Sequence, residues 1–161
     1  IESGKKVVIV TLAKPDGQFQ QFIDQFPADL DVIDSKSQNI NWGNYDAIFI
    51  PGGDPQLLFE GLKSIGFSLK QLKDSVFLLG DSAGAFILST YFYDGPTGDD
   101  LGKKVEFYKG FNPKAKLITV AHTNNPVYAN AILIKKVKDF AHKKGLDILM
   151  LEENQEKQIQ T

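Results

Sequence analysis

Short apolar segments alternate with amphipathic segments along the chain, and this alternation predicts strands and helices in turn. The apolar segments expected to form strands are residues 6–12, 30–33, 45–50, 76–79, 117–121 and 147–151. Apolar positions at helical spacing predict helices over residues 16–26, 55–62, 83–91 and 126–144. Strands that alternate with helices at this spacing predict an α/β fold of three layers, α/β/α, with a mostly parallel sheet in a single domain.

Three details of this pattern carry further expectations. Residues 76–79 are nearly all apolar, which is typical of a strand covered on both faces. In the last helix we expect Ile132, Val137, Phe140 and Ala141 to face inward. Residues 93–110 are polar and glycine-bearing with little periodicity, so we expect a long loop, and loops of that length are often functional.

In such sheets, functional sites form beyond the carboxyl ends of the strands. The residues at three predicted strand ends are Gly52-Gly53-Asp54, Gly80-Asp81-Ser82-Ala83-Gly84, and His122. The second matches the G-x-S-x-G nucleophile elbow, with an apolar strand before it and an apolar helix after it. Ser82 would project its hydroxyl as a nucleophile, and the Ala83 amide would face a developing oxyanion. The alternative is a glycine-rich turn in which Asp81 or Ser82 only caps the helix.

The strand end at Gly52-Gly53-Asp54 offers a second oxyanion donor. Adjacent glycines let the backbone approach a ligand closely, so the Gly53 amide is the candidate. The alternative is an ordinary turn. Under either interpretation Asp54, followed by Pro55, is the expected N-cap of the next helix.

A serine nucleophile needs a base, and the chain contains two histidines. His122 follows an apolar strand and is the better candidate, although it could simply bond to a loop. His142 lies late in a lysine-rich helix and is expected to be solvated or to interact with the helix dipole. A carboxylate that orients the imidazole could come from Asp94, Asp99, Asp100 or Glu106, and the residues alone do not choose among these four.

The amino-acid composition excludes several kinds of functional site and partner. The chain has no cysteine, which excludes a disulfide framework, a thiolate metal site and a cysteine nucleophile. All 18 basic residues are lysines and the net charge is -2, so we expect no nucleic-acid partner. No phosphate-binding loop, metal-ligand cluster or membrane-spanning run stands out, and we expect no cofactor, no metal and no membrane partner. The chain starts at Ile1 without a signal-peptide pattern, and we expect a cytoplasmic protein.

The residues 48–58, IFIPGGDPQLL, followed by 79–85, LGDSAGA, and by a strand that ends in His122, resemble the peptidase S51 family, which contains peptidase E and cyanophycinase. The resemblance implies a flavodoxin-like fold of the class I glutamine-amidotransferase type, with serine in place of cysteine. It implies that Ser82 is the nucleophile, His122 its base, and the Gly53 and Ala83 amides the oxyanion hole. It also implies an acid between the serine and the histidine, for which Asp99 or Asp100 fits best.

The chain also departs from this family. Members usually have an additional strand and helix before the equivalent of Lys6 and a further strand after Leu151, so we expect a domain truncated at both ends that lacks a terminal strand. Arginines that usually follow the histidine are absent here. The function we expect is a serine peptidase, monomeric or homodimeric, that hydrolyses small peptides, with Asp-X dipeptides as the substrates implied by the resemblance. The alternatives are a non-catalytic binding domain of this type and a serine esterase on a related fold.

Overall fold

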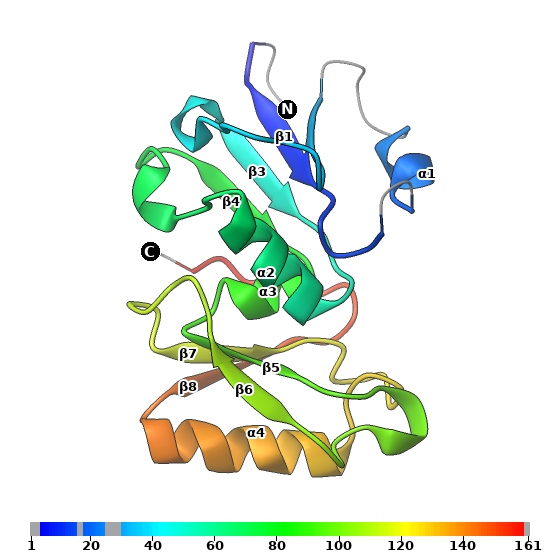
Figure 1. Ribbon diagram of the computed structural model, residues 1–161. Coiled ribbons are helices and arrows are strands. Elements are labelled where there is room, and N and C mark those ends of the chain that lie inside the picture. Colours follow the sequence, from blue (N-terminus) through cyan, green and yellow to red (C-terminus); the bar gives the residue numbers. More distant parts are fainter. Residues whose placement is uncertain (1–3, 16–17, 25–29, 160–161) are drawn as a thin grey trace. The chain divides into compact units, whose positions relative to one another are not determined.

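The computed structural model describes residues 4–15, 18–24 and 30–159. The chain divides into two compact units, unit 1 from Ile1 to Gly84 and unit 2 from Ala85 to Thr161. Each unit is built around a four-stranded sheet, and all strand pairs but one are parallel (Figure 1). The predicted α/β class with mostly parallel strands is therefore confirmed.

Unit 1 contains a wholly parallel sheet with the strand order β2-β1-β3-β4. Its strands are β1 (Val7–Val10), β2 (Asp31–Ile33), β3 (Ala47–Ile50) and β4 (Phe77–Gly80). Its helices are α1 (Gln20–Ile23), α2 (Pro55–Ser64) and the short 3₁₀ turns η1 (Trp42–Asn44) and η2 (Leu69–Gln71). The strands all lie where the sequence pattern predicts them. The predicted helix over residues 16–26 is described only in part, since residues 16–17 and 25–29 lie outside the described chain.

Both faces of this sheet contribute to the core of unit 1. On one face the fully buried side chains are Val8, Val10, Ile48 and Ile50, on the other face Ile9 is fully buried, and α2 adds Leu58 and Leu62. Helix α2 approaches the end of β1 so closely that a Cβ on Gly61 would lie 3.2 Å from the Leu12 Cβ. Since β1 lies between β2 and β3, three of its four apolar residues are buried.

The other face of the sheet corrects a prediction about β4. The register pairs Ala47 with Phe77 and Phe49 with Leu79, so these four side chains share one face. Phe77 is 60% exposed and Leu79 is 41% exposed. The expectation that residues 76–79 form a strand covered on both faces is therefore wrong. The sequence shows that this strand is apolar, but it does not show which other elements cover the two faces of the strand.

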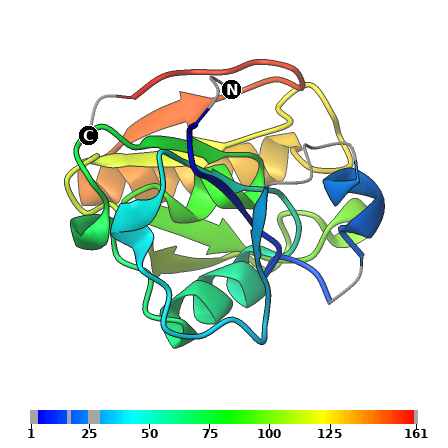
Figure 2. The same cartoon turned by 90° about the horizontal axis from the view of Figure 1, so that it is seen from above.

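Unit 2 contains a sheet with the order β6-β5-β7-β8, in which β5 and β6 are antiparallel and the other pairs parallel. Its strands are β5 (Tyr91–Asp94), β6 (Glu106–Lys109), β7 (Leu117–Val120) and β8 (Asp147–Met150). Helix α4 (Ala131–Lys144) contacts β7 and β8, and it lies along the strands of this unit when seen from above (Figure 2). Gly145 ends α4 in the left-handed conformation that favours glycine, with a φ of 65°.

Residues 93–110 are not the single long loop that their composition suggests. They complete β5, form the 3₁₀ turn η3 (Gly98–Asp100), and supply the whole of β6. The hairpin pairs Phe92 with Tyr108, whose rings stack with centroids 5.4 Å apart. Cross-strand aromatic pairs of this kind stabilise a sheet. Because they join residues far apart in the sequence, local periodicity does not predict them.

Two predicted helices are shorter than expected. Helix α3 (Ala83–Ile87) ends before Tyr91, which enters β5 instead. Helix α4 begins at Ala131 rather than at residue 126, because Asn130 is its N-cap and accepts a hydrogen bond from the Leu133 amide. Val137 and Ala141 are buried as predicted, whereas Ile132 is 54% exposed and was wrongly expected to face inward.

Candidate active site

Ser82 occupies a strained turn between β4 and α3. Its φ is 48°, in the left-handed region that non-glycine residues rarely adopt. The Gly84 amide donates to the Asp81 carbonyl at 2.8 Å, which closes the turn around the serine. The predicted combination of strand, sharp turn and helix around Ser82 is therefore present. Strain of this kind persists only where the surrounding structure enforces it, and it gathers at functional sites.

Two glycines allow this turn to lie close to the end of β3. A Cβ on Gly52 would lie 2.9 Å from the Ser82 Cβ, and a Cβ on Gly84 would lie 2.0 Å from the Ile50 carbonyl oxygen. Neither position has room for a side chain. The elbow is therefore in close contact with the end of β3, and this contact requires glycine at both positions.

The Gly52-Gly53-Asp54 segment lies against the end of β1. Gly53 has a φ of 149°, and a Cβ there would lie 2.4 Å from the Ala13 carbonyl oxygen. That carbonyl accepts the Asp54 amide hydrogen at 2.9 Å. The Asp54 side chain accepts from the Leu57 amide at 2.7 Å, which confirms the predicted N-cap of α2. Because Gly52 lies against Ser82, the turn that carries the Gly53 amide is held next to the serine.

His122 directly follows Ala121 at the carboxyl end of β7 and also has a positive φ, 58°. The Nδ1 atom of His122 lies 3.5 Å from Oε1 of Glu153, which follows the neighbouring strand β8. The imidazole is mostly buried, with 26% of its surface exposed, and the carboxylate is 41% exposed. The ring of Tyr128 lies beside the imidazole, with centroids 5.0 Å apart. A carboxylate that accepts a hydrogen bond from Nδ1 of an imidazole leaves Nε2 available as a proton acceptor.

The four carboxylates considered from the sequence lie on the β5–β6 hairpin. Asp99 and Asp100 belong to η3 and are exposed, and Asp100 accepts a hydrogen bond from Lys103 at 2.7 Å. Asp94 pairs with Glu106 in the hairpin register. Glu106 accepts a hydrogen bond from the Tyr108 hydroxyl, and this bond raises the pKa of Tyr108 above its ordinary value.

Glu153 is the residue that sequence reasoning missed. The acid expected from the sequence lies between Ser82 and His122, whereas Glu153 follows His122 in the chain. The sequence places Glu153 shortly after the predicted strand 147–151, but only the parallel pairing of β7 with β8 brings it to the same edge as His122. His122 and Glu153 each follow one of these strands by two or three residues.

The predicted residues are divided between the two units. Ser82, Gly53 and Ala83 belong to unit 1, and His122, Asp99 and Asp100 belong to unit 2. His142 is exposed in the last turn of α4, as expected for a residue near the negative end of the helix dipole.

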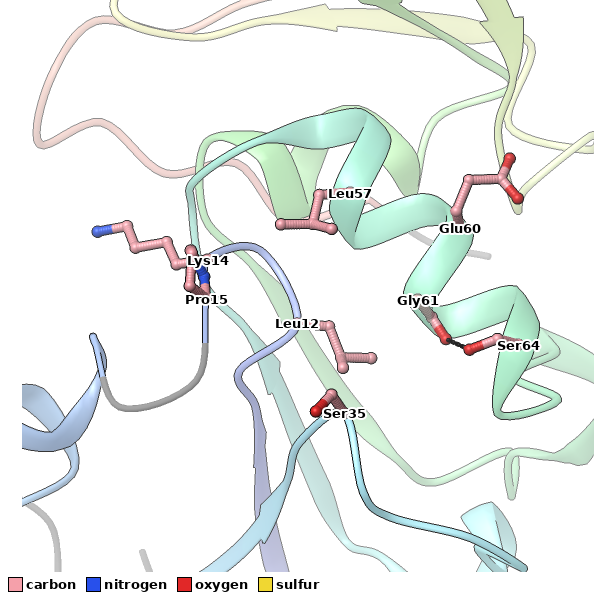
Figure 3. Close-up of a pocket in the computed structure, with 8 residues that line it drawn as sticks. All are labelled: Leu12, Lys14, Pro15, Ser35, Leu57, Glu60, Gly61 and Ser64. Carbon is pink, nitrogen blue, oxygen red and sulfur yellow. Dashed lines mark hydrogen bonds between the residues drawn. The ribbon is translucent and has the colours of Figure 1, made fainter.

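Unit 1 also contains a pocket of about 470 Å³ between the end of β1 and helix α2. Its lining residues are Leu12, Lys14, Pro15, Ser35, Leu57, Glu60, Gly61 and Ser64 (Figure 3). The charged side chains of Lys14 and Glu60 extend to opposite sides of it, and the Ser64 hydroxyl donates to the Gly61 carbonyl. Charged groups therefore do not converge on this pocket as they do around a catalytic centre.

Neither metal-binding nor membrane-spanning features are found in the part of the chain that is described. Within residues 4–15, 18–24 and 30–159, no three His, Asp or Glu side chains gather in a way that could hold a metal ion. Over the same ranges, no helix has both the length and the apolar character needed to cross a bilayer.

Comparison with known proteins bears on the fold. No protein-family model matches the sequence, and no curated protein does. A crystal structure from Listeria monocytogenes EGD-e, named as a candidate peptidase E, aligns with 92% of this chain and 80% of its own, with a TM-score of 0.59 and 20% identity. This chain has a peptidase E-like fold. A peptidase from an acI-B1 actinobacterium aligns with 93% of this chain and 68% of its own, with a TM-score of 0.48 and 20% identity.

Proposed function

We propose that this chain is a serine peptidase of the peptidase E type that hydrolyses small peptides, with Ser82 as nucleophile and His122 as general base. The observation that carries the proposal is the backbone of Ser82, which has a positive φ and lies so close to Gly52 that position 52 has no room for a side chain. Backbone strain at a serine between a strand and a helix is typical of a nucleophile elbow. The His122–Glu153 pair and the peptidase E-like fold support the same interpretation.

The proposed reaction begins when Nε2 of His122 takes the Ser82 proton and the serine oxygen attacks the scissile carbonyl. The Gly53 and Ala83 amides stabilise the negative oxygen that forms. His122 then returns the proton to the leaving amine, and the peptide bond breaks to leave an acyl-enzyme. A water molecule, deprotonated by His122, hydrolyses the ester and regenerates Ser82. No step requires a metal or an organic cofactor.

Glu153 is our candidate for the acid that orients His122, because its carboxylate is 3.5 Å from Nδ1. Catalytic hydrogen bonds are often longer in ligand-free structures and tighten when substrate binds. Asp99 and Asp100 remain the alternatives that the resemblance implies. Preference for Asp-X dipeptides is part of the proposal, and in a chain without arginine a lysine would have to bind the acidic group.

Labelling with a fluorophosphonate probe tests the nucleophile. We expect the wild type to gain one phosphonyl group by intact mass, and Ser82→Ala to gain none. Ser75→Ala, at an exposed serine before β4, is the matched control and should label like the wild type. Absence of labelling in the wild type, with no hydrolysis of Asp-X dipeptides, would favour a non-catalytic binding domain and overturn the proposal.

Comparison of three neutral variants tests the acid. Glu153→Gln should lower kcat by about 10²-fold or more, because the imidazole loses its orienting carboxylate. Asp99→Asn and Asp100→Asn should change kcat by less than about twofold if they are only solvated surface carboxylates. A larger loss of kcat in either aspartate variant would identify that aspartate of the hairpin as the acid. It would leave the proposed roles of Ser82 and His122 unchanged.

A further inference from the structure

Asn125 holds the carboxylate that faces His122. Its Nδ2 donates to Glu153 Oε1 at 2.8 Å, and this oxygen is the one 3.5 Å from His122 Nδ1. The other end of the same side chain is also engaged, since Oδ1 accepts from the Val127 amide at 3.1 Å. The amide group is therefore fixed at both ends, and its donor is aimed at a single carboxylate oxygen.

Hydrogen bonds to the backbone also connect the two segments that carry Asn125 and Glu153. The Thr123 amide donates to the Leu151 carbonyl at 3.0 Å, and the Glu153 amide donates to the Asn124 side-chain oxygen at 2.9 Å. These bonds continue the pairing of β7 with β8 beyond the strand ends. They hold Glu153 next to the loop that carries His122. The Asn125 side chain then orients the Glu153 carboxylate.

We propose that Asn125 is a positioning residue that holds Glu153 in the orientation needed to accept a hydrogen bond from His122 Nδ1; the inference rests on the proposed function of His122. A glutamate has more rotatable bonds than an aspartate and loses more freedom when fixed, so a partly exposed glutamate needs an additional restraint. An amide N–H supplies it without adding charge. A carboxylate oxygen has two lone pairs, so Oε1 can accept from Asn125 and from the imidazole together.

The test must separate this role from the structural role of the turn. Asn125→Ser removes the amide donor without adding a charge, and the serine hydroxyl can still accept from the Val127 amide. Asn130→Ser is the matched control in the same unit. Asn130 has the same arrangement, accepting from Leu133 N and donating to the Leu101 carbonyl, but it contacts no carboxylate in the described chain. Both variants should lose similar stability.

The first readout needs no substrate. The chain has only two histidines, so nitrogen-15 NMR at about pH 9, where imidazoles are neutral, reports the tautomer of His122 with His142 as an internal reference. We expect the Nδ1–H tautomer to dominate in the wild type. Asn125→Ser should reduce its population, whereas Asn130→Ser should not. In a Glu153→Ala background, Asn125→Ser should cause no further change, because its effect acts through that carboxylate.

The second readout is kinetic. Asn125→Ser should lower kcat by about tenfold with KM within about twofold, since the imidazole is misoriented but the substrate still binds. An unchanged tautomer in Asn125→Ser, or an equal effect with and without Glu153, would overturn the positioning role. If the wild type hydrolyses no peptide, the proposed function fails, and the NMR comparison alone still decides whether Asn125 orients the pair.

Discussion

Gly52 lies so close to Ser82 that a Cβ on the glycine would fall 2.9 Å from the serine Cβ. Real Cβ atoms do not approach other carbons this closely, so any side chain at position 52 would displace the serine or the end of β3. The contact couples the two glycine-bearing strand ends that the sequence singles out. It joins two residues that are far apart in the sequence, so it depends on the pairing of β3 with β4.

Gly52→Ala should therefore impair the nucleophile more than it impairs folding. We expect fluorophosphonate labelling to slow by about 10²-fold, since a displacement of about 1 Å is enough for such a loss. Gly66→Ala is a suitable control, because Gly66 has a φ of 75° and a Cβ there would meet no atom within 4 Å. It should cost about 1 kcal/mol of stability through backbone strain and leave labelling unchanged. Equal labelling of both variants would contradict the role assigned to the contact.

Asp54 offers a test of a purely structural role beside the site. Its side chain caps α2 by accepting from the Leu57 amide at 2.7 Å. Asp54→Ala should lower the free energy of unfolding by about 1 kcal/mol, whereas Asp54→Asn should cost less because asparagine also caps helices well. Chemical denaturation measures both values. Labelling of Ser82 at a temperature where both variants are folded should match the wild type, and a large loss would assign Asp54 a catalytic part.

Asp46 predicts a pH dependence of stability. A hydrogen bond from Lys73 at 2.8 Å, with a second from the Lys6 amide, lowers the pKa of Asp46 below its ordinary value. A carboxyl whose pKa is lower in the folded state contributes stability above its unfolded pKa and loses it as the pH falls through the folded one. Asp46→Asn should therefore lower Tm at pH 7, and the difference from the wild type should shrink below about pH 4. Asp74→Asn, at an exposed neighbouring position, is the control for removing a charge.

Ser89 and Thr119 form a buried polar pair in unit 2. Their hydroxyl oxygens are 2.7 Å apart, and the two residues are 1% and 2% exposed. Ser89→Ala should cost about 1–3 kcal/mol, because the Thr119 hydroxyl loses its partner while it stays buried. Adding Thr119→Val should cost little more, since the orphaned hydroxyl is then removed. A double variant whose loss equals the sum of the two single losses, measured by urea denaturation, would show that the hydroxyls are energetically independent.

Much of the fold could be predicted because its signals are local. The glycine-bearing turns predicted where β3 and β4 end, and Asp54-Pro55 predicted where α2 begins. The β5–β6 hairpin could not be predicted in this way, because the aromatic residues of β6 lie within a polar stretch and their partners are on another strand. The exposure of Phe77 was missed for a similar reason, since periodicity identifies an apolar strand but does not identify what covers it.

The candidate site divides in the same way. The sequence by itself determined the order of strands and helices, the elbow at Ser82, the cap at Asp54 and the position of His122 at a strand end, because each depends on residues within a few positions of one another. Only the tertiary structure decided that Gly52 lies against Ser82 and that Asn125 and Glu153 lie beside His122. These contacts depend on which parallel strands are neighbours in a sheet, and strand order is set by packing between distant segments rather than by local sequence.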